Sequence, residues 1–304
     1  MELDWKEIDR WIFGEAWTGS KAKEHAQVLC DEIGPRWAAS TGEHQAVEYI
    51  RDEFEKMGLE GAALQEFVLD TWTYESAEAR VGDFAIDLLP YNRCPSCVLQ
   101  APLVDVGFGT AHALDKTRDK LRGCVAVMHL ALEPFTTPVP ANIRLQALAD
   151  AGVAAVVAVD PKDGRRVEYH NGGDWREPET AELPFPAVTT SREHGRVLQH
   201  CAQQGQQIKL TVVSRFYQAP AHNVVGEIQG SRWPGERLVL GGHHDTVYGT
   251  PGGNDNASGT IAVLETARVL AELKAELEKD LMDIYIYLFI TFTINIYIII
   301  ITYI

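Results

Sequence analysis

The chain has 304 residues, of which 46% are hydrophobic and 23% are charged, and its formal net charge is −16. This composition is typical of a globular protein with a hydrophobic core, and the length predicts two domains or one domain with an insertion. The acidic balance argues against a nucleic-acid partner, because binding to phosphates needs clustered Lys and Arg side chains. We therefore expect an acidic protein that binds no nucleic acid.

The N-terminal part of the chain has α/β character. Its first 17 residues, MELDWKEIDRWIFGEAW, show no basic stretch followed by an apolar one, so we see no secretory signal and expect a cytoplasmic protein. Residues 20–33 predict a helix that Ser20 caps and that Gly34-Pro35 ends. Residues 41–58 predict a stronger helix, capped by Thr41 and ended by Gly58, and residues 64–69 predict a strand.

Residues 85–215 have a different pattern. Short β-type runs alternate with Gly, Pro and polar turns, at 102–109, 124–130, 153–160, 184–190 and 208–214. One helix is expected among them, at 142–153. The pattern predicts a separate, mostly β module.

The chemistry is concentrated after this module, where an apolar strand at 237–242 leads into His-His-Asp. Residues two apart in a strand point the same way, so His243 and Asp245 are predicted to share a face. A histidine backed by a carboxylate is a common pair at zinc sites, because the carboxylate orients the ring. A Gly-rich loop then brings Asp255 to the start of a helix at 256–273, where open α/β sheets build their sites.

This pattern carries a family resemblance. The segment LGGHHDTVYGTPGGNDNASGTIAVLETARVL, residues 240–270, resembles the first metal-binding segment of metallopeptidase family 28, the di-zinc aminopeptidases. Residues 29–60 are similar to the helical start of these enzymes, and residues 102–191 resemble the protease-associated domain inserted in many of them. The resemblance covers about residues 20–275.

The resemblance implies an architecture. It implies a zinc-exopeptidase-like three-layer α/β/α domain, incomplete here, with an inserted mostly β protease-associated domain. The corresponding boundaries are residues 1–84 for the first part of the peptidase domain, 85–215 for the insert, 216–280 for the first metal-binding segment and 281–304 for an atypical tail.

The resemblance also implies an activity, the removal of N-terminal residues from peptide substrates by a water that two zinc ions activate. His243 would bind one zinc, Asp255 would bridge the two ions, and Asp245 would orient His243. The inserted domain would shape access to the site. A carboxypeptidase or a glutaminyl-cyclase-like reaction on the same scaffold stays an alternative.

The sequence departs from the family after Asp255. The family pattern continues with an adjacent Glu-Glu pair, which supplies the general base and a ligand, and then with an Asp and a His ligand. No Glu-Glu pair follows Asp255 and no histidine follows His244, so two of the five implied ligands are present. We therefore do not expect tight binding of two zinc ions.

The missing ligands leave an alternative function open. The alternative function is that of a truncated, catalytically inactive relative that binds peptides or proteins. The remaining acids are assigned to a charged, solvent-exposed helix face, and they are Glu265, Glu272, Glu276, Glu278, Asp280 and Asp283.

The last segment, residues 281–304, is rich in Ile and Tyr and carries no charge from Ile284 onward. It is long enough for a C-terminal membrane anchor. Its composition also favours a β-rich, aggregation-prone end. We favour a third interpretation, foreign sequence, because all its residues can be written with AU-rich codons whereas the preceding chain is rich in Ala, Gly and Arg. A membrane partner is expected only if this tail is genuine.

Overall fold

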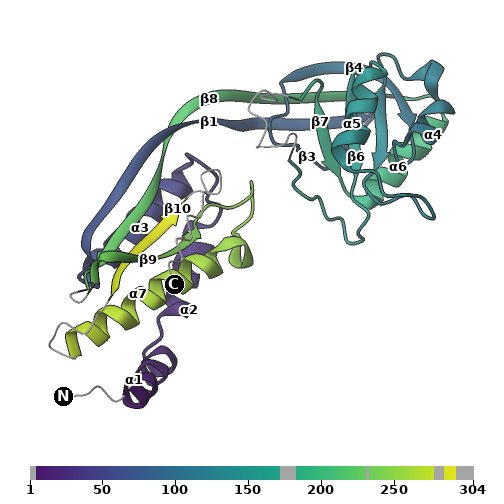
Figure 1. The fold of residues 1–304 in the computed structure, drawn as a ribbon. Helices are drawn as coiled ribbons and strands as arrows, with labels where there is room; N and C mark the ends of the chain where they lie inside the picture. The colour runs from purple at the N-terminus through teal and green to yellow at the C-terminus, as the bar shows by residue number, and fades with distance from the viewer. Residues whose placement is uncertain (1–4, 172–182, 231–232, 277–283, 292–304) are drawn as a thin grey trace. The chain divides into compact units, whose positions relative to one another are not determined.

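The computed structural model describes residues 5–171, 183–230, 233–276 and 284–291 (Figure 1). The chain forms two compact units, here called unit 1 (residues 1–71 and 218–304) and unit 2 (residues 72–217). Two long strands, β1 (Glu60–Val81) and β8 (Gln207–Ile228), each contribute to both units. The predicted domain boundaries after residues 84 and 215 stay predictions.

Unit 1 combines helices with one end of a mixed sheet. In this part of the sheet β8 pairs antiparallel with β10, and β10 pairs parallel with β9. The elements of unit 1 besides β1 and β8 are α1 (Trp5–Thr18), α2 (Ala22–Ala26), the π-helix η1 (Gln27–Ile33), α3 (Thr41–Lys56), β9 (Trp233–His243), the π-helical turn η3 (Gly253–Ala257), α7 (Ser258–Glu276) and β10 (Ile284–Thr291).

The predicted helix at 41–58 is confirmed as α3. Its N-cap is Ser40 rather than Thr41, because the Ser40 hydroxyl accepts a hydrogen bond from the backbone N–H of Glu43 at 3.2 Å. Its end is as expected, since Gly58 follows with a φ of +74°, which glycine adopts without strain. The predicted helix at 20–33 is divided into α2 and η1, and α1 was not predicted.

A single core joins the two long helices of unit 1 to the sheet. Ile50 and Phe54 of α3 pack with Val224 of β8 and with Leu264 of α7, and all four are fully buried. The helical spacing of these apolar residues explains why α3 and α7 each bury one face. The start of α7 therefore has a fixed position relative to β8.

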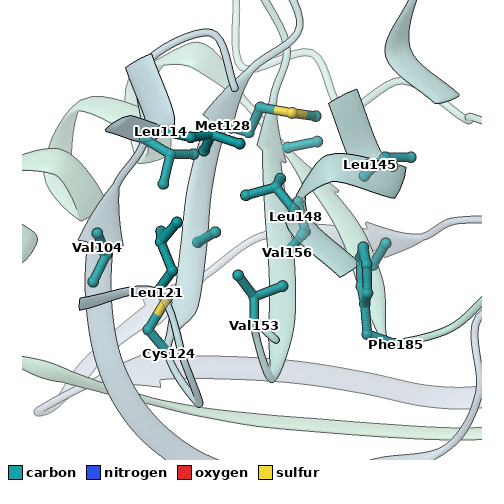
Figure 2. Packing of buried hydrophobic residues seen from close by; sticks show 14 of the residues in the cluster. Val104, Leu114, Leu121, Cys124, Met128, Leu145, Leu148, Val153, Val156 and Phe185 are labelled. Atoms are coloured by element: carbon teal, nitrogen blue, oxygen red, sulfur yellow. The ribbon is translucent and has the colours of Figure 1, made fainter. Parts of the chain in front are cut away.

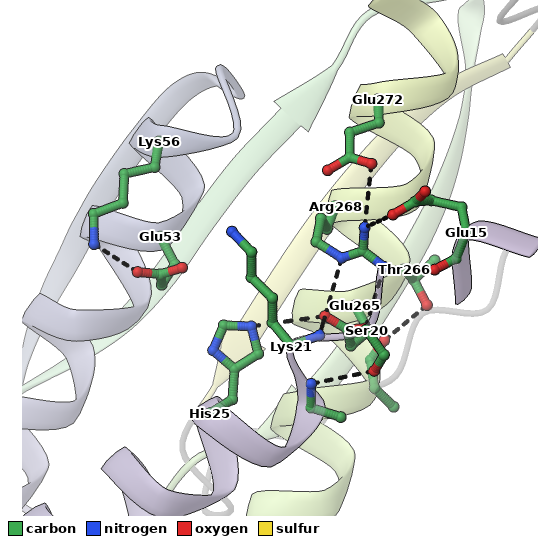
Figure 3. A network of polar contacts seen from close by, with 12 residues as sticks. Glu15, Ser20, Lys21, His25, Glu53, Lys56, Glu265, Thr266, Arg268 and Glu272 are labelled. Atoms are coloured by element: carbon green, nitrogen blue, oxygen red, sulfur yellow. Dashed lines mark hydrogen bonds and ion pairs between the residues drawn. The ribbon is translucent and has the colours of Figure 1, made fainter. Parts of the chain in front are cut away.

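The acids of α7 were expected to form a solvent-exposed face, but some of them bind a buried side chain instead. The buried guanidinium of Arg268 binds Glu265 and Glu272 of its own helix, and it also binds Glu15 of α1 (Figure 3). Burial of an arginine requires such partners, so these carboxylates hold α1 against α7. Glu278, Asp280 and Asp283 lie outside the described residues.

Residues 284–291 of the Ile/Tyr-rich segment form the strand β10, between β8 and β9. Their β-type composition therefore predicted the backbone conformation correctly, whereas the foreign-sequence interpretation stays a prediction. The proposed anchor at 281–304 falls largely outside the described residues. Among the residues that are described, no helix has the length and apolar character needed to cross a bilayer.

Unit 2 is an α/β unit with a central parallel sheet. Strands β4, β5, β6 and β7 pair in this order and run parallel, while β3 pairs antiparallel with β7, and β8 with β4. The elements are β2 (Phe84–Ile86), β3 (Leu88–Pro90), β4 (Cys97–Asp105), α4 (Ala111–Asp115), the 3₁₀-helix η2 (Arg118–Lys120), β5 (Val125–His129), α5 (Ala141–Asp150), β6 (Ala155–Val159), β7 (Ala187–Thr190) and α6 (Arg192–Gln203).

The prediction of a mostly β module missed two of the helices. The runs at 102–109, 124–130, 153–160, 184–190 and 208–214 overlap strands, and the predicted helix at 142–153 overlaps α5, but α4 and α6 were not expected. The α6 sequence REHGRVLQHCAQ is polar apart from a narrow apolar stripe, and its start is set by Ser191, whose hydroxyl accepts from the His194 N–H at 3.3 Å. Among these helices, α4 and α5 connect successive parallel strands, as crossover connections require, whereas α6 leads from β7 to the antiparallel β8.

The core of unit 2 lies between its sheet and α5 (Figure 2). Leu148 of α5 is fully buried and belongs to one cluster with Met128 of β5 and Val156 of β6. The parallel strands β5 and β6 are buried along nearly their whole length, which explains their continuous apolar sequences.

We predict that Leu148→Ala lowers the free energy of unfolding of unit 2 by about 2–5 kcal/mol, because it removes buried methyl groups and leaves a cavity. Ile143→Ala on the same helix is the matched control, since Ile143 is 57% exposed and its loss should cost under about 0.5 kcal/mol. Urea unfolding followed by circular dichroism measures both. Equal effects of the two substitutions would contradict this account of the core.

Candidate metal site

The C-terminal end of β9 brings the predicted His243 and Asp245 together. Nδ1 of His243 lies 3.1 Å from Oδ1 of Asp245, and the two side chains are 19% and 11% exposed. A carboxylate in this position holds the proton on Nδ1, so Nε2 is the ring nitrogen that can bind a cation. His244 has a different partner: it is buried, and its Nε2 lies 3.0 Å from the carbonyl oxygen of His222.

Asp255 lies on the other side of the same imidazole. The turn η3 places its Oδ1 3.1 Å from Nε2 of His243. The Asp255 side chain is 76% exposed, so its carboxylate stays accessible from solvent while one oxygen faces the histidine. All three residues singled out from the sequence therefore form one row, Asp245–His243–Asp255.

The first turn of α7 fixes the position of His243. The carbonyl oxygen of His243 accepts hydrogen bonds from the Thr260 hydroxyl at 3.0 Å and from the Asn256 side-chain amide at 3.3 Å. The Asn256 side chain also accepts from the backbone N–H of Gly259 at 3.0 Å. Gly242 allows this close approach, because a Cβ there would lie 3.1 Å from the Gly259 backbone.

A buried arginine, Arg36, connects the loops around the site. It lies between η1 and α3, and its guanidinium donates to backbone carbonyls of Leu29, Gly34, His244 and Pro251 at 2.6–2.9 Å. These carbonyls come from two segments about two hundred positions apart in the sequence. Arg36 thereby ties the N-terminal loop to the loop between His243 and Asp255.

The electrostatics of the row favour a cation. The hydrogen bond that His243 donates to Asp245 raises the pKa of His243 above its usual value, and the charges of Asp245 and Asp255 add to this against the opposing effect of burial. Two ligand atoms on a tetrahedral zinc ion lie about 3.4 Å apart, because each bond is about 2.1 Å long. The 3.1 Å between His243 Nε2 and Asp255 Oδ1 therefore fits two ligands of one zinc ion.

The sequence analysis missed Arg36 and a second cluster of Glu43, His44 and His222. Arg36 follows the Gly34-Pro35 pair that was expected to end a helix, and it carried no prediction. Asp31 and Glu32 lie close to it in the sequence, so no local pattern indicates that its partners are backbone carbonyls. The second cluster joins α3 to β8, and no local sequence pattern indicates that pairing.

We predict that Arg36→Met lowers the free energy of unfolding by at least about 3 kcal/mol, because several buried carbonyls lose their donors. Arg10→Met on α1 is the control, since Arg10 is exposed and its replacement should cost under about 0.5 kcal/mol. Urea unfolding of both variants measures the difference. A loss no larger than that of Arg10→Met would show that the loops are held in another way.

Comparison with known proteins agrees with the geometry. The sequence profile of peptidase family M28 matches residues 223–286, a range that includes the whole row and the first residues of β10. The chain is 27% identical over 234 residues to a probable leucine aminopeptidase 2 of Aspergillus oryzae, covering 74% of this chain and 43% of that protein. It is 24% identical over 288 residues to carboxypeptidase Q of Bos taurus, covering 88% and 57% respectively.

Solved structures show the same fold. A zinc aminopeptidase from Bacillus subtilis superposes with a TM-score of 0.71 at 22% identity, covering 90% of this chain and 60% of that one. A peptidase M28 precursor from Shewanella amazonensis gives a TM-score of 0.69 at 16% identity, covering 93% and 66%. The mixed α/β fold is thus that of M28 zinc aminopeptidases, and the chain spans about half the length of its curated relatives.

Proposed function

We propose that the chain contributes the first half of the metal site of a zinc-dependent exopeptidase, because its residues 223–286 match the sequence profile of peptidase family M28. The proposed reaction is hydrolysis of the N-terminal peptide bond of a peptide substrate, as in an aminopeptidase. One observation supports this above all: His243 lies between Asp245 on Nδ1 and Asp255 on Nε2, each at 3.1 Å.

In this proposal each residue of the row has one role. His243 would hold a zinc ion through Nε2, and Asp255 would supply the carboxylate ligand to which the family resemblance gives the bridging role. Asp245 holds the Nδ1 proton of His243 and so keeps Nε2 aimed at the ion. Bound zinc supplies Lewis acidity, which polarises a peptide carbonyl and lowers the pKa of water.

The number of ligands at this site is too small for catalysis by the described residues alone. His243 and Asp255 are two protein ligands, whereas a catalytic zinc takes three in addition to an open position. The proposed activity therefore belongs to a form of the protein in which further ligands and a general base complete the row. For the 304-residue chain, the ligand count favours the alternative of a peptide- or protein-binding module.

We further propose that unit 2 corresponds to the protease-associated domain implied by the sequence resemblance. Its location between two segments of unit 1 in the chain supports this assignment. In this proposal it contributes no catalytic group and influences which peptides gain access.

The first test compares zinc binding and hydrolysis. We expect His243→Ala to weaken zinc binding at least tenfold in competition with a chromophoric chelator, because an imidazole ligand is lost. His200→Ala, which removes an exposed histidine of unit 2, should leave the affinity unchanged. Release of 4-nitroaniline from leucyl-4-nitroanilide is expected only when the chain is fused to the C-terminal segment of the Bacillus subtilis zinc aminopeptidase.

The results separate the two functions. Hydrolysis by the folded, zinc-loaded fusion that His243→Ala abolishes would support the exopeptidase. A folded fusion that binds zinc but hydrolyses no aminoacyl or dipeptide substrate would overturn it and leave the binding module.

A separate prediction concerns Asp245. We expect Asp245→Asn to weaken zinc binding about 10- to 100-fold while the fold is retained, because the amide is a poorer acceptor for the Nδ1 proton. Asp163→Asn, in an exposed loop of unit 2, is the control. Chelator competition measures both variants, and an unchanged affinity for Asp245→Asn would show that His243 is oriented by other contacts.

A further inference from the structure

A second group of metal-ligating side chains lies elsewhere in unit 1. Glu43 and His44 are in the first turn of α3, and His222 is on β8. Nε2 of His44 lies 3.3 Å from one carboxylate oxygen of Glu43, and Nδ1 of His222 lies 3.7 Å from the other. One ligand atom from each residue lies within 4.8 Å of the other two, and the described residues contain no second such group.

Two atoms of this group are buried without a hydrogen-bond partner. They are Oε2 of Glu43, whose side chain is fully buried, and Nδ1 of His222. Each atom has a neighbour within the group at 3.3 or 3.7 Å, but neither makes a hydrogen bond. Buried polar atoms without hydrogen bonds are costly, so a cation bound among them would stabilise the group.

The surroundings of His222 match those of a metal-binding histidine. Its Nε2 lies 3.7 Å from Oε2 of Glu66 on β1, so one ring nitrogen faces a carboxylate and the other faces Glu43. Metal-bound histidines commonly donate their remaining ring N–H to a carboxylate, which orients the ring. The His222 backbone is also fixed, because its N–H donates to Oε1 of Glu43 at 3.1 Å.

We propose that Glu43, His44 and His222 form a second zinc site, separate from His243 and Asp255. Two imidazoles and one carboxylate are a recurrent ligand set for zinc with an open fourth position. Three ligands of one zinc lie about 3.4 Å apart, so the three ligand atoms, now within 4.8 Å of one another, must come closer together. His44 is 42% exposed, and metal binding would replace its 3.1 Å contact with the Pro220 carbonyl.

The test uses the full-length chain carrying His243→Ala and Asp255→Ala, which removes the metal site of the proposed function. We expect this double variant to bind one Zn²⁺ per chain in isothermal titration calorimetry. Adding His44→Ala should weaken that binding at least tenfold, and the half-exposed position of His44 means that the fold should persist. Adding His112→Ala, an exposed histidine on α4, is the control and should change nothing.

Two further measurements guard against a folding artefact. Glu43→Gln keeps the side-chain shape and removes the charged ligand, so it should also weaken zinc binding at least tenfold. Saturating Zn²⁺ should raise the melting temperature of the double variant, and His44→Ala should abolish that increase. Zinc binding that survives both His44→Ala and Glu43→Gln, or a double variant that binds no zinc, would overturn the proposal.

The outcomes also distinguish this site from the proposed function. If His44→Ala reduces zinc binding in the double variant while His243→Ala has no effect in the otherwise unchanged chain, the second site stands and the exopeptidase site fails. The opposite pair of results removes the second site and leaves the exopeptidase proposal intact.

Discussion

The site of unit 1 depends on the burial of one guanidinium group. Backbone carbonyls of the loop that follows β9 point inward, where water does not solvate them, and Arg36 is the donor that satisfies them. Guanidinium suits this role because it has five N–H donors in a plane and stays charged at every accessible pH. A lysine has three donors on a flexible stem and would leave part of the loop unsatisfied.

The hydrogen bonds from Arg36 also fix the positions of the other residues in the site. With the loop held, η3 and the first turn of α7 have fixed positions, and Thr260 and Asn256 secure the carbonyl of His243. The imidazole then lies between two carboxylates, each 3.1 Å away. Ligands held in advance by neighbouring hydrogen bonds bind a cation with a smaller entropic cost.

The features that the sequence predicted depend on patterns among neighbouring residues, whereas those it missed depend on contacts between distant segments. His243, Asp245 and Asp255 were identifiable because strand alternation and a Gly-rich loop are local patterns, and α3 and α7 have clear helical periodicity. Arg36 was not, because its acceptors are backbone atoms that the sequence does not display. The grouping of His222 with Glu43 arises from the packing of β8 beside α3, and α6 was missed because its apolar stripe is narrow among polar residues.

The continuity of β1 and β8 through both units has a consequence for the order of folding. Their pairing joins residues 60–81 to residues 207–228, so in an unfolded chain a long loop must close before the first hydrogen bond forms. Unit 2 occupies that loop, and its strands β4 to β7 connect through nearer segments of the chain. If unit 2 folded first, the loop left to close between β1 and β8 would be effectively shorter. Folding in that order would lower the entropic cost of assembling the sheet of unit 1, the unit that contains His243 and Asp255.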